Sequence, residues 1–227
     1  MSLSVHPVND AANAAAAKAE SLRALPRYLM STVLAGAYVG LAVVLSARLA
    51  GGVVAGTVFG VTITLLALAG VELFTINTMI MALGWLRGHV SPGEAIGVNL
   101  VSLVGNVIGA IGFAGLVHGS GILPAHTQAA APGDRLFWRA VLCTVVVSLA
   151  LCLATRATDD SAKSLVLGSG LLALVAASVE HPIATVTTCA LAIFQGTAHW
   201  SDLGQDLLLT VPGMAVGGTV LVAFPYL

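Results

Sequence analysis

The sequence predicts an all-α integral membrane protein with six transmembrane helices, arranged as two inverted three-helix repeats with broken second and fifth helices. Three observations predict this fold. Of the 227 residues, 58% are hydrophobic and only 8% are charged, a balance that a water-soluble domain does not reach. Apolar segments of membrane-spanning length recur along the chain. The two halves also match each other at one constant sequence offset.

Four apolar segments have the length of a single membrane span. A bilayer core requires about 20 apolar residues per helix, and four segments meet that requirement. They lie near residues 28–48, 94–118, 136–156 and 203–226. Before them, residues 1–27 form a polar, alanine-rich stretch without a signal peptide. We expect residues 1–27 to be a cytoplasmic segment without a function of its own, and residues 28–227 to be the transmembrane channel domain.

Two further apolar segments are too long for one straight helix and too short for two helices with a loop. Residues 49–86 contain one charged residue, Glu72, and residues 164–198 contain only Glu180 and His181 as ionisable groups. A helix can break inside a membrane where the freed backbone groups find partners within the protein. We therefore expect a discontinuous helix in each segment, with its break near the carboxylate.

An internal repeat relates the two halves at an offset of 108 residues, which pairs Glu72 with Glu180. The same offset pairs Gly105 with Gly213 and Gly109 with Gly217. In the first and fourth spans it matches Val33, Leu34, Leu41, Ala42, Leu45 and Arg48 with Val141, Leu142, Leu149, Ala150, Leu153 and Arg156. Each repeat, about 28–118 and about 136–226, holds three spans, so the second copy inserts upside down. This is the architecture of channels and transporters whose site lies where two broken helices meet.

The charges limit the partners and set the orientation. A net charge of −1 without a basic cluster argues against a nucleic-acid partner. If both termini are cytoplasmic, the inner segments carry six basic residues and the outer ones three, as the positive-inside rule favours. The inner residues are Lys18, Arg23, Arg27, Arg87, Arg156 and Lys163, and the outer ones are Arg48, Arg135 and Arg139. We expect a multi-pass protein of the inner (plasma) membrane.

Three ionisable side chains lie deep in the apolar segments: Glu72, Glu180 and His181. Placing a charge there costs about 2.5 kcal/mol or more, so each needs a reason. Both glutamates are candidate pore residues that could handle a solute or a proton. Because they occupy equivalent positions in the two repeats, we favour a structural role, in which they accept hydrogen bonds from backbone N–H groups freed at the breaks. His181 is equivalent to Leu73 and gives one side of the pore a titratable group, whose unperturbed pKa is about 6.5.

Polar residues beside the breaks are candidates to line a constriction. Thr75 and Asn77 follow Glu72 closely, although either hydroxyl or amide could instead bond to its own helix. Pro182 removes an N–H donor next to His181 and supports the second break. The glycine pairs at 105/109 and 213/217 are small-xxx-small patterns that we assign to helix packing.

Nothing in the sequence indicates an enzyme, a cofactor or a metal site. No phosphate-binding loop, catalytic triad or cluster of metal ligands is present. The three cysteines, Cys143, Cys152 and Cys189, lie in apolar segments without CxxC or Cys/His spacing, and we expect them to be small buried residues.

Four motifs follow one another along the membrane part: Gly70-Val71-Glu72-Leu73-Phe74-Thr75, Gly105-Asn106-Val107-Ile108-Gly109, Glu180-His181 and Gly217-Gly218. With them, about residues 28–226 resemble the formate/nitrite transporter family. The resemblance implies an aquaporin-like fold, a homopentamer with one pore in each subunit, and passage of small monovalent anions of weak acids such as nitrite, formate or hydrosulfide. Protons are an expected further partner, and the nitrite branch is slightly favoured.

The resemblance also assigns roles to individual residues. His181 matches the central pore histidine, and Thr75 matches the threonine of the broken second helix. Apolar constrictions fall at Phe59, Ile63 and Leu174, with Leu73 opposite His181. Such collars admit a neutral acid more readily than a hydrated ion, because removing water from a charge is costly. The implied passage therefore neutralises the anion by a proton or by strong hydrogen bonds near His181.

Three positions depart from the family pattern: Thr185, Met214 and Ser148 stand where asparagine is common. A vestibule lysine of some members is not evident before the fourth span, where Arg135 and Arg139 could supply the positive potential instead. Because these changes leave substrate choice open, two other readings stay possible: an aquaporin-type channel for neutral solutes, which the missing Asn-Pro-Ala turns oppose, and a non-transporting membrane scaffold.

Overall fold

The computed structural model describes residues 6–49, 52–122, 133–154, 157, 159–176 and 181–226, and the findings below concern these residues. They form nine α-helices: α1 (His6–Ser21), α2 (Leu25–Ala47), α3 (Gly52–Leu68), α4 (Phe74–Leu86), α5 (Pro92–Gly119), α6 (Gly133–Ala154), α7 (Asp160–Ala176), α8 (Pro182–Phe194) and α9 (Trp200–Ala215). A 3-10 turn, Leu22–Ala24, joins α1 to α2. α9 continues as a π-helical segment, Val216–Ala223, and ends in a 3-10 turn, Phe224–Tyr226.

Four of the described helices are long and apolar enough to cross a membrane: Asp10–Ala47, which includes most of α1, Pro92–Gly119, Arg135–Ala154 and Trp200–Ala223. They fall on the four predicted spans. Four shorter apolar helices, Val53–Leu65, Phe74–Leu86, Ser161–Leu174 and Pro182–Phe194, share the two predicted discontinuous segments. The described chain is therefore all-helical and largely apolar.

Local residue chemistry explains where α4 and α8 begin. Gly70, in the connection after α3, has a φ of 68°, a left-handed conformation that glycine adopts without steric cost. Leu73 then stands in extended conformation before α4. Pro182 is the first residue of α8; its ring suits a first helical position and keeps the preceding residue extended. His181 has φ −80° and ψ 126° accordingly.

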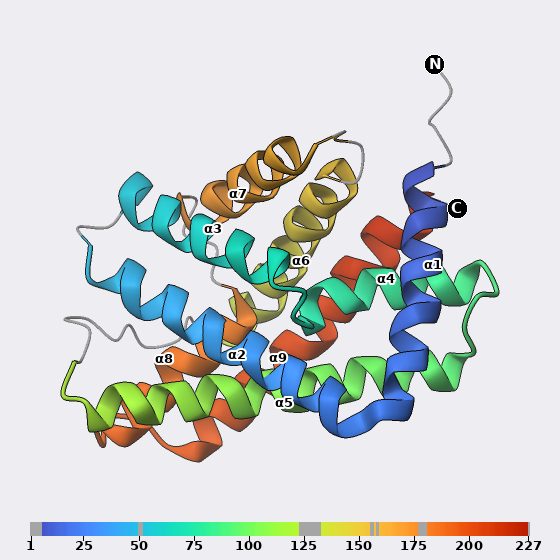
Figure 1. The fold of residues 1–227 in the computed structure, drawn as a ribbon. Helices are drawn as coiled ribbons and strands as arrows, with labels where there is room; N and C mark the ends of the chain where they lie inside the picture. Colours follow the sequence, from blue (N-terminus) through green and yellow to red (C-terminus); the bar gives the residue numbers. More distant parts are fainter. Residues whose placement is uncertain are drawn as a thin grey trace.

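Helix ends follow the 108-residue offset seen in the sequence. The ends of α3, Gly52 and Leu68, lie 108 positions before the ends of α7, Asp160 and Ala176. The ends of α4 and α8 are spaced in the same way, as are the first residues of α5 and α9. α3 and α7 lie side by side (Figure 1). They approach so closely that a Cβ atom on Gly60 would lie 2.8 Å from the carbonyl oxygen of Gly168, the equivalent residue.

Glycines set the contact between the long helices, as predicted for the small-xxx-small pairs. α2 runs beside α5 (Figure 1), and a Cβ on Gly109 would lie 1.9 Å from the carbonyl oxygen of Val33. In the second half, a Cβ on Gly217 would lie 2.6 Å from the carbonyl oxygen of Val141. Only glycine permits backbones to approach so closely. The packing role of these glycines is confirmed.

Large apolar side chains cover much of the outer surface. Exposed examples include Met30, Val53, Leu65, Ile96, Leu116, Trp138, Leu165 and Leu208. A surface of this kind suits lipid rather than water.

Candidate functional site

The first turn of α4 meets the residue that precedes α8 in the interior, where two predicted site residues touch. The Thr75 hydroxyl lies 3.1 Å from Nε2 of His181, a hydrogen bond between residues 106 positions apart. Thr75 is fully buried and His181 is 6% exposed. Because helix N-termini carry partial positive charge, both helices direct a favourable potential for anions toward this contact.

The second nitrogen of the histidine, Nδ1 of His181, is buried and makes no hydrogen bond with the residues that the structure describes. Which ring nitrogen carries the proton depends on the tautomer. In either tautomer, Thr75 occupies one nitrogen and leaves the other as a donor or an acceptor.

A buried apolar cluster contains chain neighbours of both residues, Phe74 beside Thr75 and Ile183 close to His181. Phe59, Ile63, Leu73 and Leu174, the predicted constriction residues, all belong to one buried cluster, which also contains Ile183 of α8. Each of the four is at most 6% exposed. These four side chains offer no polar group to replace the water of an ion, which raises the cost of carrying a full charge past them.

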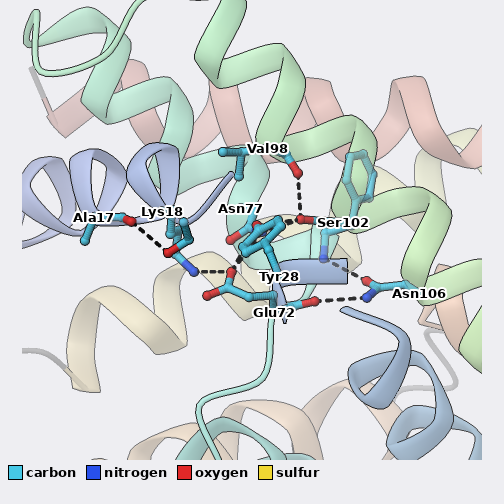
Figure 2. Close-up of polar contacts among 10 residues, drawn as sticks. Ala17, Lys18, Tyr28, Glu72, Asn77, Val98, Ser102 and Asn106 are labelled. Atoms are coloured by element: carbon cyan, nitrogen blue, oxygen red, sulfur yellow. Dashed lines mark hydrogen bonds and ion pairs between the residues drawn. The ribbon is translucent and has the colours of Figure 1, made fainter. Parts of the chain in front are cut away.

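Glu72 lies at the centre of a second polar cluster, which Figure 2 shows. Its carboxylate forms an ion pair with Lys18 of α1. It also accepts hydrogen bonds from the Tyr28 hydroxyl at 3.4 Å and from Nδ2 of Asn77 at 3.2 Å. Lys18 and Glu72 are each 17% exposed in their side chains. The ion pair joins α1 to the connection between α3 and α4.

Ser102 of α5 closes this cluster. Nδ2 of Asn77 donates to the Ser102 hydroxyl at 2.7 Å, and the Tyr28 and Ser102 hydroxyls lie 3.0 Å apart. Ser102 in turn donates to the carbonyl of Val98 at 2.7 Å. Nδ2 of Asn77 therefore bonds to side chains outside its own helix, while its buried Oδ1 has no partner among the described residues.

The backbone just before α4, where we predicted the first break, is held by Asn106 of α5 and not by the glutamate. Oδ1 of Asn106 accepts from the N–H of Phe74 at 2.8 Å, and its Nδ2 donates to the carbonyls of Thr32 and Glu72 at 2.8 and 2.9 Å. We expected Glu72 to accept such backbone groups. That expectation is wrong for Glu72, because an amide offers a donor and an acceptor to neighbouring peptide groups at once. The Glu72 carboxylate can only accept hydrogen bonds, and it pairs with the Lys18 cation instead.

The structure brings the predicted site residues into two groups, Thr75 with His181 and Glu72 with Asn77. The predicted residue Glu180 lies outside the described residues, so its role as a site residue stays a prediction. Sequence reasoning missed the roles of Lys18, Tyr28, Ser102 and Asn106. The alanines at 12, 15 and 19 are the buried residues of α1 near Lys18. Their spacing does not identify Glu72 as the partner of Lys18.

The described residues contain no group of three or more His, Cys, Asp or Glu side chains that could hold a metal ion. Cys143, Cys152 and Cys189 are buried, as predicted, and none of them forms a disulfide among the described residues. The Cys152 thiol donates to Sδ of Met79 at 3.6 Å.

Comparison with known proteins places this geometry in a family context. The family model described as formate/nitrite transporter matches residues 6–227. The nitrite transporter NirC of Salmonella typhimurium is 33% identical, over 88% of this chain and 81% of the relative. A probable formate transporter of Methanothermobacter thermautotrophicus is 32% identical, over 96% of this chain and 94% of the relative.

Solved structures agree with the fold. An FNT family ion channel has a TM-score of 0.87 and 30% identity, and the match covers 97% of each chain. A pentameric formate channel with formate bound has a TM-score of 0.73 at 18% identity, over 90% of this chain and 96% of the other. The matched relatives are transporters and channels rather than enzymes, which confirms the prediction that this chain is not an enzyme.

Proposed function

Given that the chain belongs to the formate/nitrite transporter family, we propose that it conducts small monovalent anions of weak acids across a membrane. Nitrite or formate is the proposed cargo, and hydrosulfide is a further candidate. Relatives named for nitrite and for formate are almost equally similar to this chain, at 33% and 32% identity. The family therefore supports the class of solute, and transport measurements must rank its members.

The proposed architecture is six spans in two inverted repeats, with α3 and α4 as one broken span and α7 and α8 as the other. Its support is the shared offset of the helix ends and the apolar character of all four short helices. An odd number of spans per repeat turns the second copy over, which directs the starts of α4 and α8 toward each other.

The contact between Thr75 and His181 carries the functional proposal. A hydroxyl and an imidazole meet at two helix N-termini beside a buried apolar cluster, so an anion that reaches them finds hydrogen bonds and a positive potential there. Nδ1 of His181 is the atom we assign to the solute, because Thr75 holds the other nitrogen. The apolar residues on both sides then favour passage of the solute as a neutral or fully hydrogen-bonded acid.

We further propose a homopentamer in the inner (plasma) membrane, with a pore in each subunit and both termini in the cytoplasm. The similarity to a pentameric channel and the exposed apolar side chains support assembly within a bilayer. The six-to-three excess of basic residues on the inner segments supports the orientation.

Stopped-flow uptake into proteoliposomes tests the proposal. Purified protein is compared with empty vesicles for nitrite, formate, hydrosulfide and chloride, with glycerol as the neutral solute, at an acidic and a neutral pH. We expect weak-acid anions to enter faster at the acidic pH and chloride and glycerol to stay near the level of empty vesicles. Selective glycerol entry would identify a neutral-solute channel, and no entry of any solute would favour the scaffold.

The variant His181→Phe tests the assignment of the histidine. It keeps a buried ring but removes both nitrogens, so pH-dependent anion flux should disappear while the oligomer elutes unchanged on size exclusion. Unchanged flux between pH 5 and 8 would contradict the role that we assign to His181.

A further inference from the structure

The second helices of the two broken spans, α4 and α8, begin with residues of different hydrogen-bonding capacity, Phe74 and Pro182. In the first repeat, the N–H of Phe74 opens α4 and is accepted by Asn106. The residues 108 positions further on are Pro182, which opens α8, and Met214 of α9. A donor and its acceptor in the first repeat are thus replaced together, by a residue without an N–H group and by a side chain without an amide.

The helices that carry these residues are arranged alike in both repeats. A Cβ on Gly105 would lie 2.6 Å from Cβ of Thr32, and a Cβ on the equivalent Gly213 would lie 2.9 Å from Cβ of the equivalent Ala140. α9 therefore lies on α6 as α5 lies on α2. Met214 follows Gly213 as Asn106 follows Gly105, and the side chains of Met214 and Asn106 are both fully buried.

Met214 also lies in the right surroundings to replace the amide. It belongs to the same buried apolar cluster as Ile183, the second residue of α8. The residues before the two helices share one conformation: Leu73 has φ −96° and ψ 128°, and His181 has φ −80° and ψ 126°. Two different solutions thus hold the same backbone shape.

In the second repeat, Pro182 and Met214 each require the other. A buried N–H without an acceptor costs free energy, and so does a buried amide without a donor. Pro182 has no N–H to satisfy and restricts His181 to the extended conformation by the contact of its ring with the preceding residue. Met214 then fills the space without introducing a polar group. With alanine at 182 and methionine at 214, the backbone N–H of residue 182 would have no acceptor. With proline at 182 and asparagine at 214, Oδ1 of the asparagine would have no donor.

We propose that Pro182 and Met214 form a matched positioning pair that holds His181 against Thr75, in the role that the Asn106 amide has in the first repeat. The inference rests on the proposed function only for its effect on anion binding. The pairing itself is a property of the fold and can be measured without transport.

A double-mutant cycle on the purified oligomer tests the pairing. The variants are Pro182→Ala, Met214→Asn and both together, and the readout is the temperature at which half of the oligomer peak is lost on size exclusion. We expect each single variant to lower this temperature and the double variant to recover much of the loss, because Oδ1 of the new asparagine accepts from the new N–H. Losses that simply add would overturn the pairing.

Met214→Leu is the matched control, since it conserves volume and adds no polar group. It should stay close to the wild type. A loss as large as that of Met214→Asn would mean that shape alone decides at position 214, and would also overturn the proposal.

Nitrite uptake at equal amounts of intact oligomer tests the effect on His181. Pro182→Ala frees the backbone of residue 181, so KM should rise roughly fivefold, the size expected when one hydrogen bond to the solute weakens, and the double variant should restore it. An unchanged KM in Pro182→Ala would overturn the positioning role. If the wild type itself transports no anion, the proposed function fails, and the stability cycle still decides the pairing.

Discussion

Lys18 of α1 forms an ion pair with Glu72, in the connection between α3 and α4. α1 reaches this position by packing against α4 (Figure 1). The two helices lie so close that a Cβ on Gly84 would be 2.2 Å from Cβ of Ala15. The ion pair is largely buried, and Tyr28 and Asn77 complete the hydrogen bonding of the carboxylate. The N-terminal helix is thus part of the polar structure beside the first break.

Glu72→Gln should release α1 from the rest of the protein. Removing one partner of a mostly buried pair leaves the other charge without compensation, and we expect a cost of roughly 2 kcal/mol, between surface and fully buried pairs. Trypsin should then cleave faster after Lys18. Cleavage after Arg23, whose side chain is 84% exposed, serves as the internal reference. An unchanged ratio of the two cleavage rates would mean that the ion pair does not hold the helix.

Asn106→Leu should destabilise the oligomer, because it orphans the N–H of Phe74 and the carbonyls of Thr32 and Glu72. Buried unsatisfied groups cost about 1–3 kcal/mol each, so a melting temperature several degrees lower is expected. Asn99→Leu on the same helix is the control. The Asn99 amide donates to the carbonyl of Ala95, one turn earlier in its own helix, and its loss should change little. Equal effects of the two variants would contradict the role of Asn106 at the break.

Much of the fold can be predicted from the sequence, because the lengths of the apolar segments and the constant 108-residue offset between the repeats are signals that extend over many residues. Residue positions such as Thr75 and His181 could be assigned because each lies next to a predicted break. The contact of Lys18 with Glu72 spans 54 positions and depends on how α1 folds back onto α4. Neither composition nor periodicity carries that information, so a polar N-terminal stretch resembled an uninvolved segment.

The role of Glu72 was mistaken for a related reason. A carboxylate and an amide can both bond to a broken helix, and the sequence places Glu72 nearer to the break than Asn106. Which of them reaches the Phe74 N–H depends on the direction of α5 relative to α4. The π-helical segment after Ala215 has no signal that we recognised either, although the equivalent part of α5 is regular.

Gly109→Ala should disrupt the contact between α2 and α5. The new methyl group would lie 1.9 Å from the carbonyl oxygen of Val33, a backbone atom that cannot move aside cheaply. Gly112→Ala on the same helix meets nothing within 4 Å and should be neutral or slightly stabilising, since alanine favours the helix. The yield of intact oligomer after heating measures both. A stable Gly109→Ala oligomer would contradict the close approach of the two backbones.

Thr75→Val should reduce anion flux without loss of the oligomer. Valine keeps the shape of threonine but removes the hydroxyl that holds Nε2 of His181 at 3.1 Å. The loss of one net hydrogen bond predicts a reduction of up to roughly tenfold in nitrite uptake. Thr78→Val is the matched control, because the Thr78 hydroxyl donates to the carbonyl of Thr75 in its own helix and does not contact the histidine in any described interaction. Its uptake should stay near that of the wild type. If both variants lost flux equally, hydroxyl loss anywhere in α4 would explain the result, and the contact between Thr75 and His181 would not be the transport site.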